Sequence, residues 1–185
     1  DADAVVMTTG SRPAPAQPIP GQEASTIEVR GAGEILGQLP SGIKHAVVAD
    51  EGGGRNGLAA AEVLCEAGVH VTIVTTSPAV AELVDGTVRT QLYRFLMERG
   101  CQFKPNEAVS ELDGSTVKTR NIYSKQNGSI EAVDLLINWQ GNRVMNDLEE
   151  AVRSCGKRFE FAGDCSAPRT VQIAIAEGAA AARAI

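Results

Sequence analysis

Short apolar runs alternate along the chain with longer stretches that have helical spacing. The runs Ala46–Ala49 and Val71–Val74 stand on either side of an Ala-rich segment, Leu58–Ala67, which is followed by Gly68. Two buried-type strands around a helical segment that ends in glycine are typical of a βαβ unit with parallel strands. Residues 43–75 are therefore predicted to form one βαβ unit.

The pattern beyond residue 75 extends this α/β interpretation. Residues 88–99 have the apolar spacing of a helix, and residues 133–139 form another buried run of the parallel type. Three segments between them alternate like antiparallel strands, with two turns at paired Asn/Asp-Gly positions: residues 108–112, 116–119 and 121–124, with turns at Asp113-Gly114 and Asn127-Gly128. The predicted fold is a Rossmann-like parallel sheet with flanking helices and a small antiparallel β excursion.

Both ends of the chain carry further elements. Residues 11–21 contain four prolines, which exclude a helix or a central strand there. The remaining expected elements are a strand over 3–10, a short strand over 26–29, a helical turn over 33–39, a strand that opens at Phe103, a loop and short helix over 143–155, a strand over 159–162, and a closing helix whose first turn holds Pro168.

A Gly-x-Gly-x-x-Gly motif, formed by Gly52, Gly54 and Gly57, lies between the first strand and the helix of the βαβ unit. The first glycine allows a tight turn, and the second lets backbone N–H groups approach a pyrophosphate. The third lets the helix pack closely on the sheet and point its N-terminus at the phosphate. Placed between a strand and a helix, the motif predicts a dinucleotide-binding turn.

The rest of this fingerprint is altered. The end of the second strand holds Thr75 and Thr76, where a ribose-binding acid or a phosphate-binding Arg is expected. Asp50 and Glu51 precede the glycines and put negative charge beside a pyrophosphate, which Arg55 offsets only in part. Two interpretations stay open: the unit binds a nucleotide, or it survives as architecture that holds cofactor weakly or not at all.

Amino-acid composition and net charge restrict the binding partners and the cellular compartment that we expect for the protein. The 185 residues suffice for one large or two small domains, and 43% hydrophobic with 22% charged residues is ordinary for a globular protein. A net charge of −6 argues against nucleic acid and anionic membranes as partners. Four well-separated cysteines without a C-x-x-C pair predict isolated buried thiols, no metal site and a reducing, cytoplasmic location.

Two further motifs, Thr9-Gly10 and Gly163-Asp164, give the chain its resemblance to a known family. Thr9-Gly10 stands before the proline-rich segment, and Gly163-Asp164 stands before the last helix. In this order around the βαβ unit, they resemble the two-dinucleotide-domain flavoprotein reductases, in which one nucleotide-binding domain is inserted into another. The resemblance implies that residues 1–42 and 141–185 belong to a first FAD- or ADP-binding domain and that residues 43–140 form the inserted NAD(P)-binding-like domain.

Within that superfamily, the segment VHVTIVTTSPAVAELVDGTVRTQLYRFLMERGCQF is similar to the old-yellow-enzyme-related multidomain enzymes, such as trimethylamine and histamine dehydrogenases, N-demethylases and 2,4-dienoyl-CoA reductase. The likeness implies a parent oxidoreductase, assembled as a homo-oligomer, whose FMN-binding TIM barrel and 4Fe-4S cluster lie outside this chain. It also implies ADP, FAD or NAD(P)H as ligands of the present region. The chain starts without Met and ends within a helix, so we expect a fragment of a longer polypeptide.

Three functional hypotheses follow. The first is a nucleotide-binding or architectural module that supplies no catalytic acid, base or nucleophile; the second is a working NAD(P)H domain that delivers hydride to a flavin. The third is a non-catalytic docking domain. The resemblance assigns Asp164 to the polyol or ribose beside a pyrophosphate, against a simple helix-capping role, while WQGN at 139–142 departs from the segment that usually approaches nicotinamide.

Overall fold

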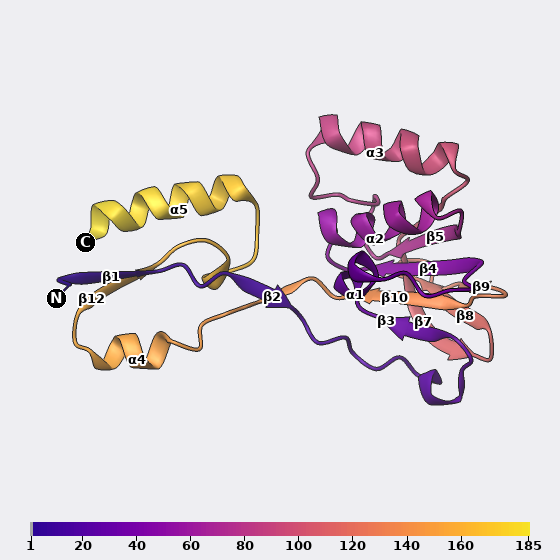
Figure 1. Cartoon of the computed structure of the whole chain (residues 1–185), viewed down its shortest axis with the longest axis horizontal. Coiled ribbons are helices and arrows are strands. Elements are labelled where there is room, and N and C mark those ends of the chain that lie inside the picture. Colours follow the sequence, from indigo (N-terminus) through magenta and orange to yellow (C-terminus); the bar gives the residue numbers. More distant parts are fainter. Residues whose placement is uncertain (1) are drawn as a thin grey trace. The chain divides into compact units, whose positions relative to one another are not determined.

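The computed structural model describes residues 2–185, which divide into two compact units. We call Pro15–Gly141 the central unit, and the described residues up to Ala14 together with Asn142–Ile185 the terminal unit. Both are labelled by element in Figure 1.

The central unit is built on a five-stranded parallel sheet. Its spatial order is β3 (Glu28–Arg30), β10 (Leu135–Trp139), β4 (His45–Asp50), β5 (His70–Thr75) and β6 (Gln102–Pro105). The connecting helices are α1 (Ala32–Gly37), α2 (Arg55–Glu66) and α3 (Gly86–Glu98), and a 3-10 turn, η1, covers Gln22–Ala24.

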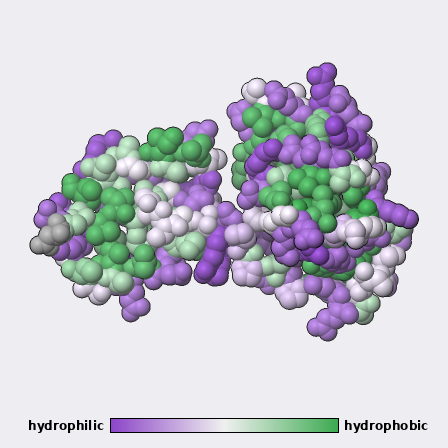
Figure 2. All heavy atoms as spheres, in the orientation of Figure 1, coloured by the Kyte–Doolittle hydropathy of each residue, from purple (hydrophilic) through white to green (hydrophobic). Residues whose placement is uncertain are grey.

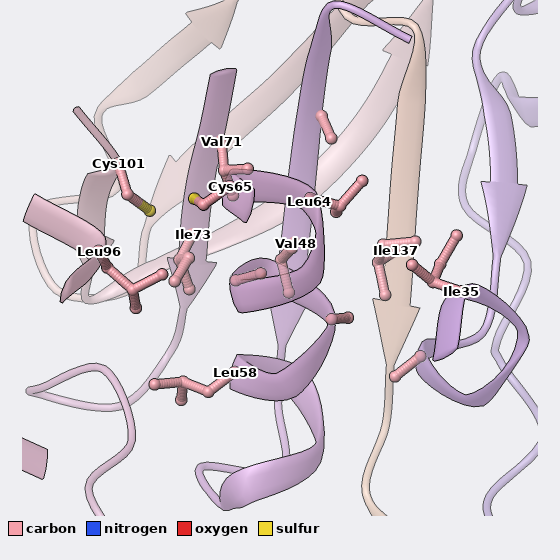
Figure 3. Packing of buried hydrophobic residues seen from close by; sticks show 14 of the residues in the cluster. Ile35, Val48, Leu58, Leu64, Cys65, Val71, Ile73, Leu96, Cys101 and Ile137 are labelled. Carbon is pink, nitrogen blue, oxygen red and sulfur yellow. The ribbon is translucent and has the colours of Figure 1, made fainter. Parts of the chain in front are cut away.

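Helices cover one face of this sheet. Val48 of β4 and Ile73 of β5 belong to the same buried cluster as Leu58 and Leu64 of α2. Figure 3 shows these side chains between α2 and the strands, with Ile35 of α1 beside Ile137 of β10. Since side chains alternate across a strand, the residues between them face the other side.

The opposite face is covered by a three-stranded antiparallel sheet of β7 (Glu107–Asp113), β8 (Thr116–Asn121) and β9 (Asn127–Ile130). Leu112 of β7 and Val117 of β8 share a second buried cluster with Val47, Val74 and Leu136 of the parallel strands. Burial on both faces explains why β4, β5 and β10 are continuous apolar runs rather than alternating ones. The predicted α/β fold with its antiparallel excursion is confirmed.

The terminal unit contains two small sheets. β1 (Ala4–Met7) pairs in parallel with β12 (Arg158–Phe161), and β2 (Ser11–Pro13) pairs antiparallel with β11 (Asn142–Val144). Its helices are α4 (Glu149–Ser154) and α5 (Val171–Ala184), with the 3-10 turn η2 over Gly163–Cys165. Figure 2 shows apolar residues gathered over α5, where Val171 and Ile175 are each 68% exposed.

Two expectations need correction at the ends of elements. The first domain was expected to include residues 1–42. This range contains β3, which pairs with β10, and the residues from Pro15 onward belong to the central unit. The closing helix begins at Val171 rather than near Pro168, because η2 and a short extended segment precede its N-cap, Thr170.

The position predicted for the third antiparallel strand is wrong. Residues 122–125 form a turn, and Asn127-Gly128 lies in β9 instead of in a turn. The cause is the side chain of Asn121, whose Oδ1 accepts the N–H groups of Tyr123 at 3.0 Å and Ser124 at 2.9 Å. An Asx turn of this kind reverses the chain before the Asn-Gly pair is reached.

Replacing Asn121 by Ala should therefore weaken the β8–β9 hairpin. Two backbone N–H groups lose their acceptor, which costs about 1 kcal/mol of unfolding free energy. Urea denaturation followed by circular dichroism measures the change, with Asn127→Ala as the matched control, for which we expect a much smaller loss. An equal loss in both variants would contradict the assignment of the turn to Asn121.

Candidate functional site

The candidate site lies at the carboxyl edge of the parallel sheet, where β4 and β10 end side by side. From β4 the chain proceeds outward through β5 to β6, whereas β10 and β3 lie on the other side of β4. Such a reversal of strand order creates a crevice that binds ligands in open α/β sheets. The motif glycines Gly52, Gly54 and Gly57 follow β4 directly, so the structure places all three at this crevice.

The indole of Trp139 lies against the first glycine of the motif. Trp139 ends β10, pairs in register with Asp50, and accepts the N–H of Glu51 through its carbonyl at 2.9 Å. A Cβ on Gly52 would lie only 2.4 Å from Trp139 Nε1. Gly52 is thus required for the close approach of an indole.

The carboxyl group of Asp50 fills the interior of the glycine turn. Its Oδ1 accepts the N–H groups of Gly52 and Gly53, both at 3.1 Å. A Cβ on Gly57 would lie 2.7 Å from Asp50 Cγ, so the third glycine leaves room for this carboxyl group beneath the first turn of α2. Two N–H groups of the turn are therefore satisfied by an internal acceptor rather than by a ligand.

Asp50 is held in an environment that disfavours its charge. The side chain is 1% exposed, and Oδ2 has no hydrogen-bond partner among the described residues. Burial raises the pKa of Asp50 to about 6, and the neighbouring Glu51 charge adds to the rise, while the two backbone N–H groups oppose it. At neutral pH the turn encloses a negative charge, which disfavours a second anion nearby.

The second glycine is the open part of the motif. The nearest atom to a Cβ on Gly54 is the Gly52 carbonyl oxygen at 3.9 Å, and no side chain caps α2, which begins after Gly54. Arg55, expected to offset the acidic residues, instead pairs with Glu62 at 2.6 Å. Thr75 is buried, and its hydroxyl accepts the N–H of Ser77 at 3.2 Å. β5 itself ends without an acid, and the exposed carboxylate of Glu51 accepts the hydroxyl of Thr76 directly after this strand.

A cavity of about 150 Å³ opens at the same edge, beside the proline-rich segment. It is lined by residues 17–20, by the ends of β4 and β10, and by Val109. Asn138, 4% exposed within β10, donates through Nδ2 to the carbonyl of Gln17 at 3.1 Å and accepts from Gln140 at 2.7 Å. The cavity is smaller than the roughly 300–1,000 Å³ typical of ligand pockets.

Sequence reasoning missed Asn138 and did not foresee what Asp50 and Trp139 contact. A signal for Asn138 was present, since a lone amide inside the buried run LLINW needs a partner. The chemistry offered at this edge is hydrogen bonding by amides and backbone groups. Among residues 2–185, no cluster of three or more His, Cys, Asp or Glu side chains is arranged to hold a metal ion.

The two remaining motifs come together in the terminal unit. Gly10 accepts the N–H of Met145 through its carbonyl at 3.0 Å, and the Thr9 hydroxyl donates to the carbonyl of Met145. Asp164 accepts the hydroxyl of Ser11 at 2.7 Å through Oδ2 and the N–H of Arg169 at 3.3 Å through Oδ1. The structure therefore brings the segment after Gly10 into contact with the Gly163-Asp164 turn.

Arg169 is engaged within the same unit. Its guanidinium pairs with Glu177 of α5, which also accepts the N–H of Gly163 at 2.9 Å. Glu177 thereby joins η2 to the helix and neutralises the arginine. Asp164 is partly exposed and keeps acceptor capacity beside its two bonds.

Comparison with known proteins defines the class. A model of the pyridine nucleotide-disulphide oxidoreductase family matches residues 1–160, and the chain belongs to this family. No curated protein sequence matches the chain. None of the helices within residues 2–185 has the length and apolar character needed to cross a membrane.

Solved structures share the fold. Histamine dehydrogenase from Rhizobium sp. 4-9 superimposes with a TM-score of 0.79 and 22% identity, over 99% of this chain and 30% of that one. For the 6-hydroxypseudooxynicotine amine oxidase of Pseudomonas geniculata N1 the values are 0.78, 21%, 97% and 28%. For an FAD-dependent pyridine nucleotide-disulphide oxidoreductase of Desulfovibrio vulgaris they are 0.58, 19%, 89% and 46%.

These identities establish a likeness of fold, and the chain spans less than half the length of each of the three proteins. The resemblance drawn from Thr9-Gly10, the glycine motif and Gly163-Asp164 is confirmed at the level of family and fold. The chain thus shares the fold of a part of each of these three proteins.

Replacing Asp50 by Asn tests the enclosed carboxylate. A raised carboxyl pKa means that the native state binds the proton more tightly than the unfolded state, so the charge destabilises the fold above about pH 6 and this cost disappears as pH falls towards 4. The variant lacks the charge but keeps the acceptor for Gly52 and Gly53. Its unfolding free energy relative to wild type should fall by about 2–3 kcal/mol between pH 7.5 and pH 4.

Trp139, the single tryptophan of the chain, reports unfolding of the central unit by fluorescence in urea. Asp134→Asn is the matched control, because backbone N–H groups of His45 and Lys44 lower the pKa of Asp134. Its pH dependence should have the opposite sign, because a lowered pKa means that the native state favours the charged form of Asp134. A pH-independent difference for Asp50→Asn would contradict the enclosure of a charged group.

Proposed function

We propose that the chain is a nucleotide-binding and architectural module of a flavin-dependent oxidoreductase, in which the central unit is architectural and the terminal unit holds the nucleotide. The observation that carries this division is the filled glycine turn, where Asp50 accepts two of the N–H groups and Trp139 lies against Gly52. These residues do not fit a complete NAD(P)H dinucleotide. Hydride transfer through the central unit is therefore not part of this proposal.

The terminal unit fits an ADP- or FAD-type nucleotide better. Asp164 stands at a turn directly before α5, and Ser11, hydrogen-bonded to it, follows the Thr9-Gly10 segment. A carboxylate with spare acceptor capacity suits a ribose or polyol hydroxyl. When bound, an FAD supplies electron transfer; the residues of this chain would bind and orient its nucleotide part through Asp164 and the turn at Gly163.

The parent protein is proposed to be of the amine dehydrogenase or N-demethylase type. Support comes from the sequence likeness over residues 69–103 and from the shared fold of the histamine dehydrogenase and the amine oxidase. On this proposal the FMN-binding TIM barrel, the 4Fe-4S cluster, the substrate site and the contacts of a homo-oligomer involve other residues. Within the present chain, no side chain is assigned a catalytic role.

An observation on the central unit supports a second candidate, a working NAD(P)H domain. Gly54 is unobstructed and the N-terminus of α2 is uncapped, so a single phosphate group can approach there. This candidate requires Trp139 to move from Gly52 and the charge on Asp50 to be tolerated beside a phosphate. The apolar side chains exposed on α5 support instead a docking role for the terminal unit.

Calorimetric titration of the nucleotide-free, full-length protein with ADP, NADH and NADPH distinguishes these candidates. We expect ADP to bind and the nicotinamide nucleotides to bind no more tightly than ADP. Replacement of Asp164 by Ala should weaken ADP binding by about 10- to 150-fold, the effect of one lost hydrogen bond to a charged group. Asp147→Asn, an exposed acidic residue of the same unit, is the matched control and should leave binding unchanged.

Each outcome assigns a different role. Binding of NADH or NADPH clearly tighter than ADP, and unaffected by Asp164→Ala, would overturn the division of roles and restore hydride delivery to the central unit. Absence of binding for all three nucleotides would leave a purely architectural or docking module. ADP binding that survives in Asp164→Ala would move the nucleotide to another part of the protein.

A further inference from the structure

Two cysteines that are distant in sequence face each other in the central unit. Cys65 lies in the last turn of α2, and Cys101 lies between α3 and β6. Figure 3 shows their two sulfur atoms pointing toward one another across the gap between these elements. The expectation of four isolated thiols is therefore wrong for this pair.

The remaining two cysteines have different partners. The Cys165 thiol lies 3.0 Å from the carbonyl oxygen of Met7, and the exposed Cys155 thiol lies 3.2 Å from that of Ala151. Cys65 and Cys101, by contrast, face each other, and the Cys101 thiol also lies 3.8 Å from the carbonyl oxygen of Gln102. They are only 5% and 8% exposed and belong to one apolar cluster, so neither side chain is free to turn away into solvent.

The two thiols differ in acidity. Donation from Cys101, helped by the positive charge of Arg99, lowers the pKa of Cys65, while the same bond and burial raise that of Cys101. A thiolate is the form that attacks an oxidant, whereas a neutral neighbouring thiol attacks in the second step. The lowered pKa of Cys65 thus favours Cys65 as the reacting sulfur and Cys101 as the resolving one.

We propose that Cys65 and Cys101 are a reversible dithiol–disulfide pair, which a peroxide oxidises and which then fastens the end of α2 to the start of β6. In the first step Cys65 attacks hydrogen peroxide, which leaves a sulfenic acid and releases one water. In the second, the Cys101 sulfur displaces the hydroxyl of the sulfenic acid, an S–S bond forms, and a second water leaves. Two thiols lose two electrons and two protons, and one peroxide is reduced to two waters.

The fold favours closure of this bond. The sulfur atoms point toward each other and would need to approach to about 2.05 Å, and both residues belong to one buried cluster. The loop between positions 65 and 101 contains β5 and α3, so the cross-link restrains a long segment of the unfolded chain. The oxidised protein should accordingly be more stable, and a dithiol reductant should reverse the effect.

Peptide mapping of the full-length protein by mass spectrometry, after hydrogen peroxide treatment and without reduction, tests the proposal directly. We expect one cross-linked peptide pair that contains Cys65 and Cys101 and has lost two hydrogens. The thermal unfolding midpoint should rise by about 5 °C on oxidation and return on addition of dithiothreitol. Cys155→Ser, which removes the exposed thiol, is the matched control and should keep the full shift.

Cys65→Ala and Cys101→Ala should each abolish the shift. Mapping of the wild-type protein remains decisive if either variant fails to fold, because it needs no substitution. The proposal would be overturned by cross-links only between protein molecules or through Cys155, by conversion of Cys65 to its sulfinic acid without a cross-link, or by two unmodified thiols. These readouts are independent of nucleotide binding, so the two proposals fail separately.

Discussion

Burial of both faces of β4, β5 and β10 is the constraint on which the rest of the central unit depends. Val48 and Ile73 face the helices, whereas Val47 and Val74 face the antiparallel sheet, so each strand is apolar on both sides. Strands of this kind leave their polar chemistry to the residues at their ends. The site residues are consequently concentrated at the carboxyl edge, where Asp50 and Trp139 end two neighbouring strands in register.

At that edge the Asp50 side chain accepts the N–H groups of Gly52 and Gly53, which a ligand accepts in a functional dinucleotide site. The glycines keep their steric purpose, but what approaches them is an indole at Gly52 and a carboxyl group at Gly57. The enclosed carboxylate carries an electrostatic cost, visible in the pKa of Asp50 raised to about 6. A turn that retains the motif while enclosing a charge supports the architectural role proposed for the central unit.

Periodicity was sufficient to predict the layered fold, since β4, α2, β5 and β10 are long and strongly patterned. The β8–β9 turn was misplaced because a side-chain contact of Asn121 competes with the Asn-Gly signal. The glycine motif lies between β4 and α2, as its position in the sequence predicts. The approach of Trp139, 82 or more positions further along the chain than any motif glycine, depends on strand order, which no local pattern encodes. The same holds for Cys65 and Cys101, which only the packing of α2 and α3 brings together.

The two units also differ in how completely they bury their own surfaces. The central unit has a covered five-stranded sheet, while the terminal unit has pairs of strands and an apolar helix, α5, of which only Ala181 is buried. Two-stranded sheets are only marginally stable in isolation. The exposed Val171 and Ile175 form an apolar surface on one helix, of the kind that contacts other protein surfaces. A nucleotide held at Asp164 would bind beside this incompletely covered helix. Nucleotide binding and the packing of α5 against further protein surface are therefore expected to stabilise each other, since both order the same turn and helix.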